Sequence, residues 1–265
     1  MRHRTYIALW IVGLTIGWFE AAIVVDLRAL FYPNGFTFPL AVMPTRLLGV
    51  EVAREVCSLV LLAAIGWLAG QRKAERWGAF LLLFGIWDLV YYVVLKLVLD
   101  WPAGMDLSTW DILFLIPLPW TGPIWAPALV AAEFVAIGSY LYYTAERQRE
   151  YNGLDITILA GAAVTVVLSF LVEWRSVVES RAPESFPVAL FVTGVLLMGS
   201  LIIIPAATAK RLSRNLTEML VISAAVALVV TELGSLAAAW LHRETGPVIV
   251  ILAGLVFILS LARSR

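Results

Sequence analysis

Six acidic and two basic side chains lie inside stretches of the sequence that are otherwise apolar. They are Glu20, Glu51, Glu55, Asp88, Glu133 and Glu232, with Arg54 and Lys96. An ionisable side chain within hydrocarbon costs about 2.5–3.5 kcal/mol on insertion scales, so such residues mark functional sites or buried ion pairs. An isolated buried carboxylate takes up a proton rather than staying charged. The excess of acid therefore predicts protonated carboxyls, a wet site or a bound cation.

The densest group of charges lies in the stretch 47–69. Glu51, Arg54 and Glu55 stand at positions i, i+3 and i+4, which share one face of a helix. Both carboxylates can therefore flank the one guanidinium. Two interpretations stay open: a structural ion network near a helix N-terminus, where acids are favoured, or an outward-facing acidic site with Arg54 as its internal counter-ion.

A second polar row lies in the stretch 77–99. Asp88, Tyr92 and Lys96 stand at i, i+4 and i+8, with Tyr91 on the flank. The row is either a hydrogen-bonded strut whose Lys96 reaches the membrane surface or a polar relay from mid-membrane to the outer surface. The complete candidate polar site consists of Glu20, Glu51, Arg54, Glu55, Asp88, Tyr91, Tyr92, Lys96, Asp111 and Glu133.

The residue types limit the chemistry of this site. Oxygen ligands suit hard ions such as Mg²⁺, Ca²⁺, Mn²⁺ or Na⁺, or a cationic organic molecule. The two histidines, His3 and His242, lie at the edges of apolar stretches, so no haem or other histidine-ligated centre is expected. No nucleophile elbow, phosphate-binding loop or His-Glu-x-x-His motif is present. We therefore assign no catalytic residue and favour a protein that is not an enzyme.

Composition sets the surroundings of these residues. Of the 265 residues, 62% are apolar and 14% are charged, and the mean hydropathy is +0.91. Soluble domains carry about 25% charged and 45–50% apolar residues, so an ordinary soluble enzyme is excluded. The single cysteine, Cys57, excludes a disulfide scaffold, and equal numbers of basic and acidic residues exclude an electrostatic nucleic-acid binder.

The apolar stretches predict an all-α, polytopic bundle of about eight membrane-spanning helices, because crossing the bilayer takes about 20 apolar residues. Their approximate ranges are 5–25, 47–69, 77–99, 126–144, 155–172, 187–207, 216–241 and 246–262. Residues 1–150 would form a four-span bundle with the acidic and aromatic residues. Residues 151–265 would form a four-span hydrophobic scaffold, and both halves would belong to one integrated membrane domain.

Basic residues predict the orientation, because Lys and Arg resist translocation across the membrane. With the N-terminus and the C-terminus inside, twelve of the nineteen basic residues lie on the inner side. These are Arg2, Arg4, Arg72, Lys73, Arg76, Arg147, Arg149, Lys210, Arg211, Arg214, Arg263 and Arg265. This topology places the ionisable residues of the spans at mid-depth or in the outer half.

The long outer connection, residues 100–125, is rich in Trp and Pro. Ser108 followed by Asp111 and an apolar run that stops at Pro117 predicts a short helix. That helix would be either interfacial, within the aromatic belt, or re-entrant between the spans.

Residues 80–127 carry a distinctive string. It reads Trp87-Asp88-x-x-Tyr91-Tyr92-x-x-x-Lys96, Trp101-Pro102, Thr109-Trp110-Asp111 and Phe114-Leu115-Ile116-Pro117-x-Pro119-Trp120-x-Gly122-Pro123. This string resembles uncharacterised bacterial polytopic membrane proteins that have no assigned function. The resemblance implies a multi-pass protein of the bacterial cytoplasmic (inner) membrane.

Three functions remain compatible with the sequence. The first is a small transporter or permease-like protein with an outward-facing, cation- or proton-coupled acidic site. The second is a structural, accessory or sensing subunit of a membrane complex, in which buried ion pairs specify helix packing. The third is a membrane-embedded enzyme for a lipid-linked substrate, which would need carboxyls of displaced pKa. The expected partners are membrane lipids and another membrane protein or a second copy of this chain, with no nucleic acid.

Overall fold

The computed structural model describes residues 2–113, 120–145, 153–179, 181–202, 232–237 and 239–240. The chain divides into two units. The first consists of Met1–Arg149 and Glu173–Ser185, and the second of Glu150–Val172 and Phe186–Arg265.

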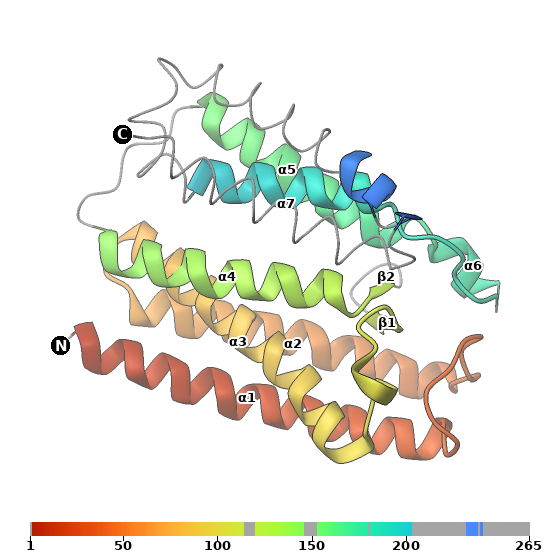
Figure 1. The fold of residues 1–265 in the computed structure, drawn as a ribbon. Helices are drawn as coiled ribbons and strands as arrows, with labels where there is room; N and C mark the ends of the chain where they lie inside the picture. Colours follow the sequence, from red (N-terminus) through yellow and green to blue (C-terminus); the bar gives the residue numbers. More distant parts are fainter. Residues whose placement is uncertain are drawn as a thin grey trace. The chain divides into compact units, whose positions relative to one another are not determined.

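Within the described residues, five helices are long and apolar enough to cross a membrane. They are α1 (Arg2–Phe31), α2 (Thr45–Ala69), α3 (Lys73–Leu99), α4 (Trp125–Thr144) and the stretch Ala160–Val178, which spans most of α5 (Gly153–Leu171) and all of α6 (Trp174–Val178). The predicted class, a polytopic helical membrane protein, is confirmed (Figure 1). The predicted sixth span corresponds to α7 (Val188–Ile202), and most of the last two predicted spans lies outside the described residues.

Helix α3 is the centre of the first unit, because α1, α2 and α4 each pack against it. Glycines allow the close approach of α3 and α4. A Cβ atom on Gly138 would lie 2.5 Å from the Leu82 backbone nitrogen, and one on Gly85 would lie 2.4 Å from the Ala131 carbonyl oxygen. Such glycines let the backbones of two helices approach closely. Inside a lipid bilayer the hydrophobic effect does not drive helices together, so the dispersion forces of this close packing hold the pair instead.

The loops between the helices begin at residues that cannot continue them. Helix α1 runs without a breaker to Phe31 and ends before Pro33, and Gly35 then takes a positive φ of 99°. Helix α3 ends at Asp100, which adopts the left-handed conformation with a φ of 51°. The ends of α1 and α3 and the starts of α2 and α4 therefore lie at the same end of the bundle formed by α1 to α4 (Figure 1).

The connection between α3 and α4 contains a β-hairpin, so the helix predicted after Ser108 is wrong. After one 3-10 turn, Ala103–Met105, strand β1 (Trp110–Leu113) pairs antiparallel with β2 (Trp120–Pro123), and Asp111 lies opposite Gly122. Trp and Ile favour strands. Strand pairing also satisfies backbone groups that a helix of one or two turns would leave without partners at both ends.

The second unit contains α5 and α7, which pack against each other. Phe170, Phe186 and Phe191 form a ring cluster with centroid separations of 5.4–5.6 Å. A Cβ atom on Gly194 would lie 2.7 Å from Val166, so this pair also relies on a glycine for its close contact.

Candidate functional site

A cavity of about 200 Å³ lies within the first unit, among α1, α2, α3, the segment 32–44 and β1. Helices α1 and α2 pack on α3 rather than closely on each other, which leaves space between them. Its ionisable lining residues are Glu20, Arg28, Tyr32, Glu51, Arg54, Glu55, Asp88 and Tyr91. The other lining residues are Val24, Leu27, Phe31, Phe36, Leu40, Ala41, Met43, Leu48, Trp87 and Ile112.

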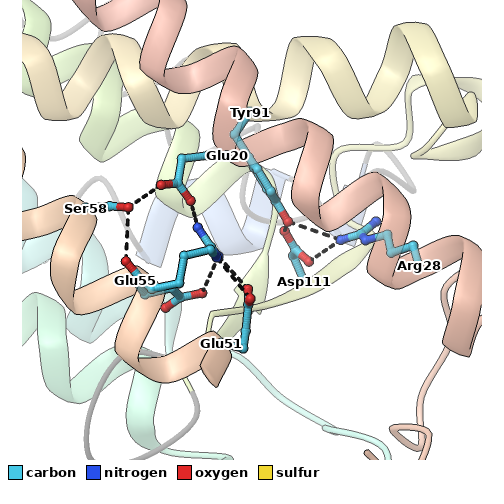
Figure 2. A network of polar contacts seen from close by, with 8 residues as sticks. Glu20, Arg28, Glu51, Glu55, Ser58, Tyr91 and Asp111 are labelled. Carbon is cyan, nitrogen blue, oxygen red and sulfur yellow. Dashed lines mark hydrogen bonds and ion pairs between the residues drawn. The ribbon is translucent and has the colours of Figure 1, made fainter. Parts of the chain in front are cut away.

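Arg54 is the hub of a buried ion network that links α1 and α2 (Figure 2). Its Nε donates to Glu51 Oε2 at 2.9 Å, and its Nη2 lies 3.6 Å from Glu55 Oε1. Its Nη1 pairs with Glu20, and the hydroxyl of Ser58 also donates to Glu20. Three carboxylates therefore share one guanidinium, and Glu20 arrives from a helix far away in the sequence.

A second network ties the hairpin to the helices (Figure 2). Arg28 Nη2 donates to Asp111 Oδ1 at 2.8 Å, and the Tyr91 hydroxyl lies 3.3 Å from the same nitrogen. The Arg28 guanidinium also lies 3.9 Å from the centre of a Trp101 ring and 4.4 Å from that of Phe36. Such cation–π contacts stabilise a desolvated cation. This network fixes β1 and the segment after α1 against the body of the unit.

Asp111 lies outside the membrane-spanning helices and is only 2% exposed. Burial raises the pKa of its carboxyl, while the charge of Arg28 and hydrogen bonds favour the ionised form and oppose that rise. The ion pair with Arg28 explains how a carboxyl is accommodated on a buried strand.

Sequence reasoning missed Arg28, because it placed the end of the first span near residue 25. Arg28 is 6% exposed and belongs to the same helix as Glu20, eight residues away. The sequence signal that could have placed Arg28 in the helix is the lack of a helix breaker before Pro33. Continuation of the helix by about one turn beyond residue 25 brings this side chain onto the cavity.

Asp88 differs from the other acids on the cavity. Its side chain is 7% exposed, and no hydrogen-bond or ion-pair partner for it occurs among the described residues. The other carboxyls that line the cavity, Glu20, Glu51 and Glu55, pair with Arg54. The second guanidinium on the cavity, that of Arg28, pairs with Asp111, which does not line it. Asp88 is therefore a carboxyl on the cavity with which no described guanidinium pairs.

Four of the predicted site residues do not line the cavity, and one of them, Asp111, belongs to the Arg28 network described above. Tyr92 is buried with Leu95, Trp101 and Ile124. Lys96 Nζ donates to Asp100 Oδ1 at 2.6 Å and to the Pro102 carbonyl at 2.8 Å, near the end of α3. Glu133, on α4, is half-buried and does not line the cavity. The polar row of α3 thus separates into a cavity residue, Asp88, and a helix-end contact, Lys96.

Across the described ranges, no group of three or more His, Cys, Asp or Glu side chains is arranged to hold a metal ion. Three of the cavity carboxyls, those of Glu20, Glu51 and Glu55, are instead arranged around Arg54.

Comparison with known proteins gives one local similarity. Residues 185–264 match the model of the ABC 3 transport family, which is less than a third of the 265-residue chain. The match covers nearly all of Phe186–Arg265, the later of the two segments of the second unit. Much of it lies outside the described residues. No solved structure matches the chain. Together with its apolar helices, this similarity supports a multi-pass integral membrane protein with a permease-like role in transport.

Proposed function

We propose that this chain is a membrane component of a transport system, and that the cavity of its first unit binds a cation at Asp88. The observation that carries the proposal is the buried Asp88 side chain, which has no hydrogen-bond or ion-pair partner in the described part of the chain and lies on a cavity that holds more carboxyls than guanidinium groups. A cation beside Asp88 would replace the lost hydration of that carboxylate. The similarity of residues 185–264 to a transport family supports the same class of function.

The position of the cavity is compatible with binding or release of the cation on one side of the membrane. Its lining includes the segment 32–44 and Ile112 of the hairpin, at the end of the unit that the basic residues predict to face outside. We place the protein in the bacterial cytoplasmic membrane and expect it to act with a partner protein, as a permease-like component does. Proton coupling through the same carboxyl is the alternative form of this proposal.

A purely structural role accounts for less of the site. The Arg28 and Arg54 networks join α1, α2, α3 and the hairpin, so they would serve packing in any membrane protein. Asp88 makes no such contact among the described residues, and a buried carboxyl without a partner destabilises a fold. A ligand or a proton bound by Asp88 would explain why a carboxyl occupies this buried position.

The test is a thermal-stability titration of the purified chain in nanodiscs. Na⁺, Mg²⁺, Ca²⁺, Mn²⁺ and n-butylammonium are added separately to the parent, Asp88→Asn and Asp26→Asn, the last being an exposed acid on α1 as matched control. We expect one cation to stabilise the parent and Asp26→Asn, by about 2.7 kcal/mol at 100 times its dissociation constant. Asp88→Asn should not respond, and without cation it should be at least as stable as the parent.

Equal stabilisation of the parent and Asp88→Asn would contradict the proposed site. A lack of response to every cation at several pH values, with the parent folded, would contradict cation binding. If stability changed only with pH, and only when Asp88 was present, the proton would be the bound cation.

A further inference from the structure

The lining of the cavity combines carboxyls on α1, α2 and α3 with a largely apolar set of residues on α1 and the segment 32–44. Glu20 and Phe31 are eleven residues apart on α1, which is about 16 Å along a helix, and Leu48 precedes Glu55 on α2 by about 10 Å. Glu20 and Glu55 thus lie farther from the segment 32–44 along their helices than Phe31 and Leu48 do. That segment contributes Tyr32, Phe36, Leu40, Ala41 and Met43.

This lining is unsuited to a bare metal ion. Ca²⁺ takes about six to eight oxygen ligands, and Mg²⁺ requires a near-octahedral set. Three of the carboxyls on the cavity are held by Arg54, and no metal-binding group of acids exists within the described part of the chain. Asp88 offers two oxygens. The hydroxyls of Tyr32 and Tyr91 already accept from the Ala41 N–H and from Arg28, and the remaining aliphatic and aromatic residues offer no oxygen.

The same lining suits an organic cation. An ammonium group needs one carboxylate and a few further acceptors, and its apolar substituent would bury surface against Val24, Leu27 and Leu40. The volume also fits, because an apolar cavity of about 150 Å³ is large enough for benzene, and this cavity measures about 200 Å³.

We propose that the ligand of the cavity is a small organic ammonium ion with an apolar substituent of about four to six carbon atoms, a size that follows from the volume comparison. The ammonium group lies at Asp88, and the substituent lies between α1, α2 and the segment 32–44. This inference rests on the proposed function and adds the chemical class of the substrate.

The experiment measures binding of radiolabelled n-butylammonium to the purified full chain in nanodiscs. We expect saturable binding to the parent and to Asp26→Asn, and at least tenfold weaker binding to Asp88→Asn. Asp88→Glu keeps the charge and should bind more tightly than Asp88→Asn. Unlabelled n-butanol, which lacks the charge, should not compete, and neither should millimolar Mg²⁺, Ca²⁺ or Mn²⁺.

A second variant tests the apolar part of the site. Leu40 is half-buried on the segment 32–44, outside the helices, so Leu40→Ser should leave the fold intact. Loss of its apolar surface should weaken n-butylammonium binding by about three- to tenfold, whereas methylammonium, which lacks the chain, should bind the parent and Leu40→Ser alike. Equal binding of n-butylammonium to both would overturn the assignment of its substituent.

The outcomes separate this inference from the proposed function. If a metal ion binds in a manner that depends on Asp88 and n-butylammonium does not bind, the ligand class is overturned while the cation site stands. If n-butylammonium and n-butanol bind equally well, the site is merely apolar and the inference fails. If no cation distinguishes the parent from Asp88→Asn, both proposals fail.

Discussion

Replacement of Arg54 by methionine is expected to destabilise the protein by about 3–5 kcal/mol, the usual effect of removing one partner from a buried ion pair. The reason is that Glu20, Glu51 and Glu55 all pair with this one guanidinium. Methionine keeps much of the length and apolar surface of the arginine stem but none of its charge. The three carboxyls would then be buried together without a counter-ion.

The effect can be measured by unfolding in mixed micelles with increasing fractions of a denaturing detergent. Arg46→Met is the matched control, because Arg46 is exposed near the start of the same helix and should change stability by less than about 0.5 kcal/mol. Adding Glu20→Gln to Arg54→Met should recover part of the loss, since one uncompensated acid is removed. If Arg54→Met and Arg46→Met were equally stable, the network around Arg54 would not be a structural element of the protein.

Substitution of Gly138 by alanine is expected to destabilise the protein by about 1–3 kcal/mol or more, as overpacking does in a close-packed interior. The added Cβ would lie 2.5 Å from the Leu82 nitrogen and 2.6 Å from the Gly78 carbonyl oxygen. Both are backbone atoms of α3, so no side-chain rotation relieves the clash and the helices must separate. The cavity is lined by α3 residues, so cation binding should weaken as well.

Gly49→Ala is the control, because nothing lies within 4 Å of the position of its Cβ on α2. Alanine favours a helix over glycine by up to about 1 kcal/mol, so this variant should be neutral or more stable. The opposite signs of the two glycine substitutions are therefore the expected result of the same unfolding measurement. A Gly138→Ala variant as stable as Gly49→Ala would contradict the close contact of α3 and α4.

The helices of the first unit could be predicted from sequence because each is a long apolar stretch bounded by Pro, Gly or charged residues. The sharing of Arg54 by Glu51 and Glu55 also follows from local spacing, since residues three and four apart on a helix are neighbours. Their partner Glu20 could not be derived in this way. It joins them only because α1 and α2 both pack on α3.

The hairpin shows where local rules fail. Ser108, Asp111 and Pro117 carry the signals of a short helix, but Asp111 pairs with Arg28 and β1 pairs with β2. Tertiary contacts of this kind outweigh the weak preference of a short segment. Arg28 itself was missed because its position depends on the helix continuing beyond the apolar stretch that was expected to end near residue 25.

Asp88 and Glu133 show a different limit. Asp88 stands in a polar row of its helix and Glu133 stands alone, but neither pattern says which helices enclose a cavity. In the structure Asp88 lines the cavity and Glu133 does not, because the lining comes from α1, α2, α3, the segment 32–44 and β1 and includes no described residue of α4. The charge excess of the sequence thus predicted an acidic site, while the residue that distinguishes the site depended on packing.

The most direct test of the cation site is infrared difference spectroscopy of the protein in lipid, recorded before and after addition of n-butylammonium. Carboxyl and carboxylate bands report the acid that the cation contacts. We expect a change in these bands in the parent and in Asp26→Asn, and its loss in Asp88→Asn. A difference spectrum that is the same in the parent and in Asp88→Asn would contradict the account, because the ligand would then bind without contacting Asp88.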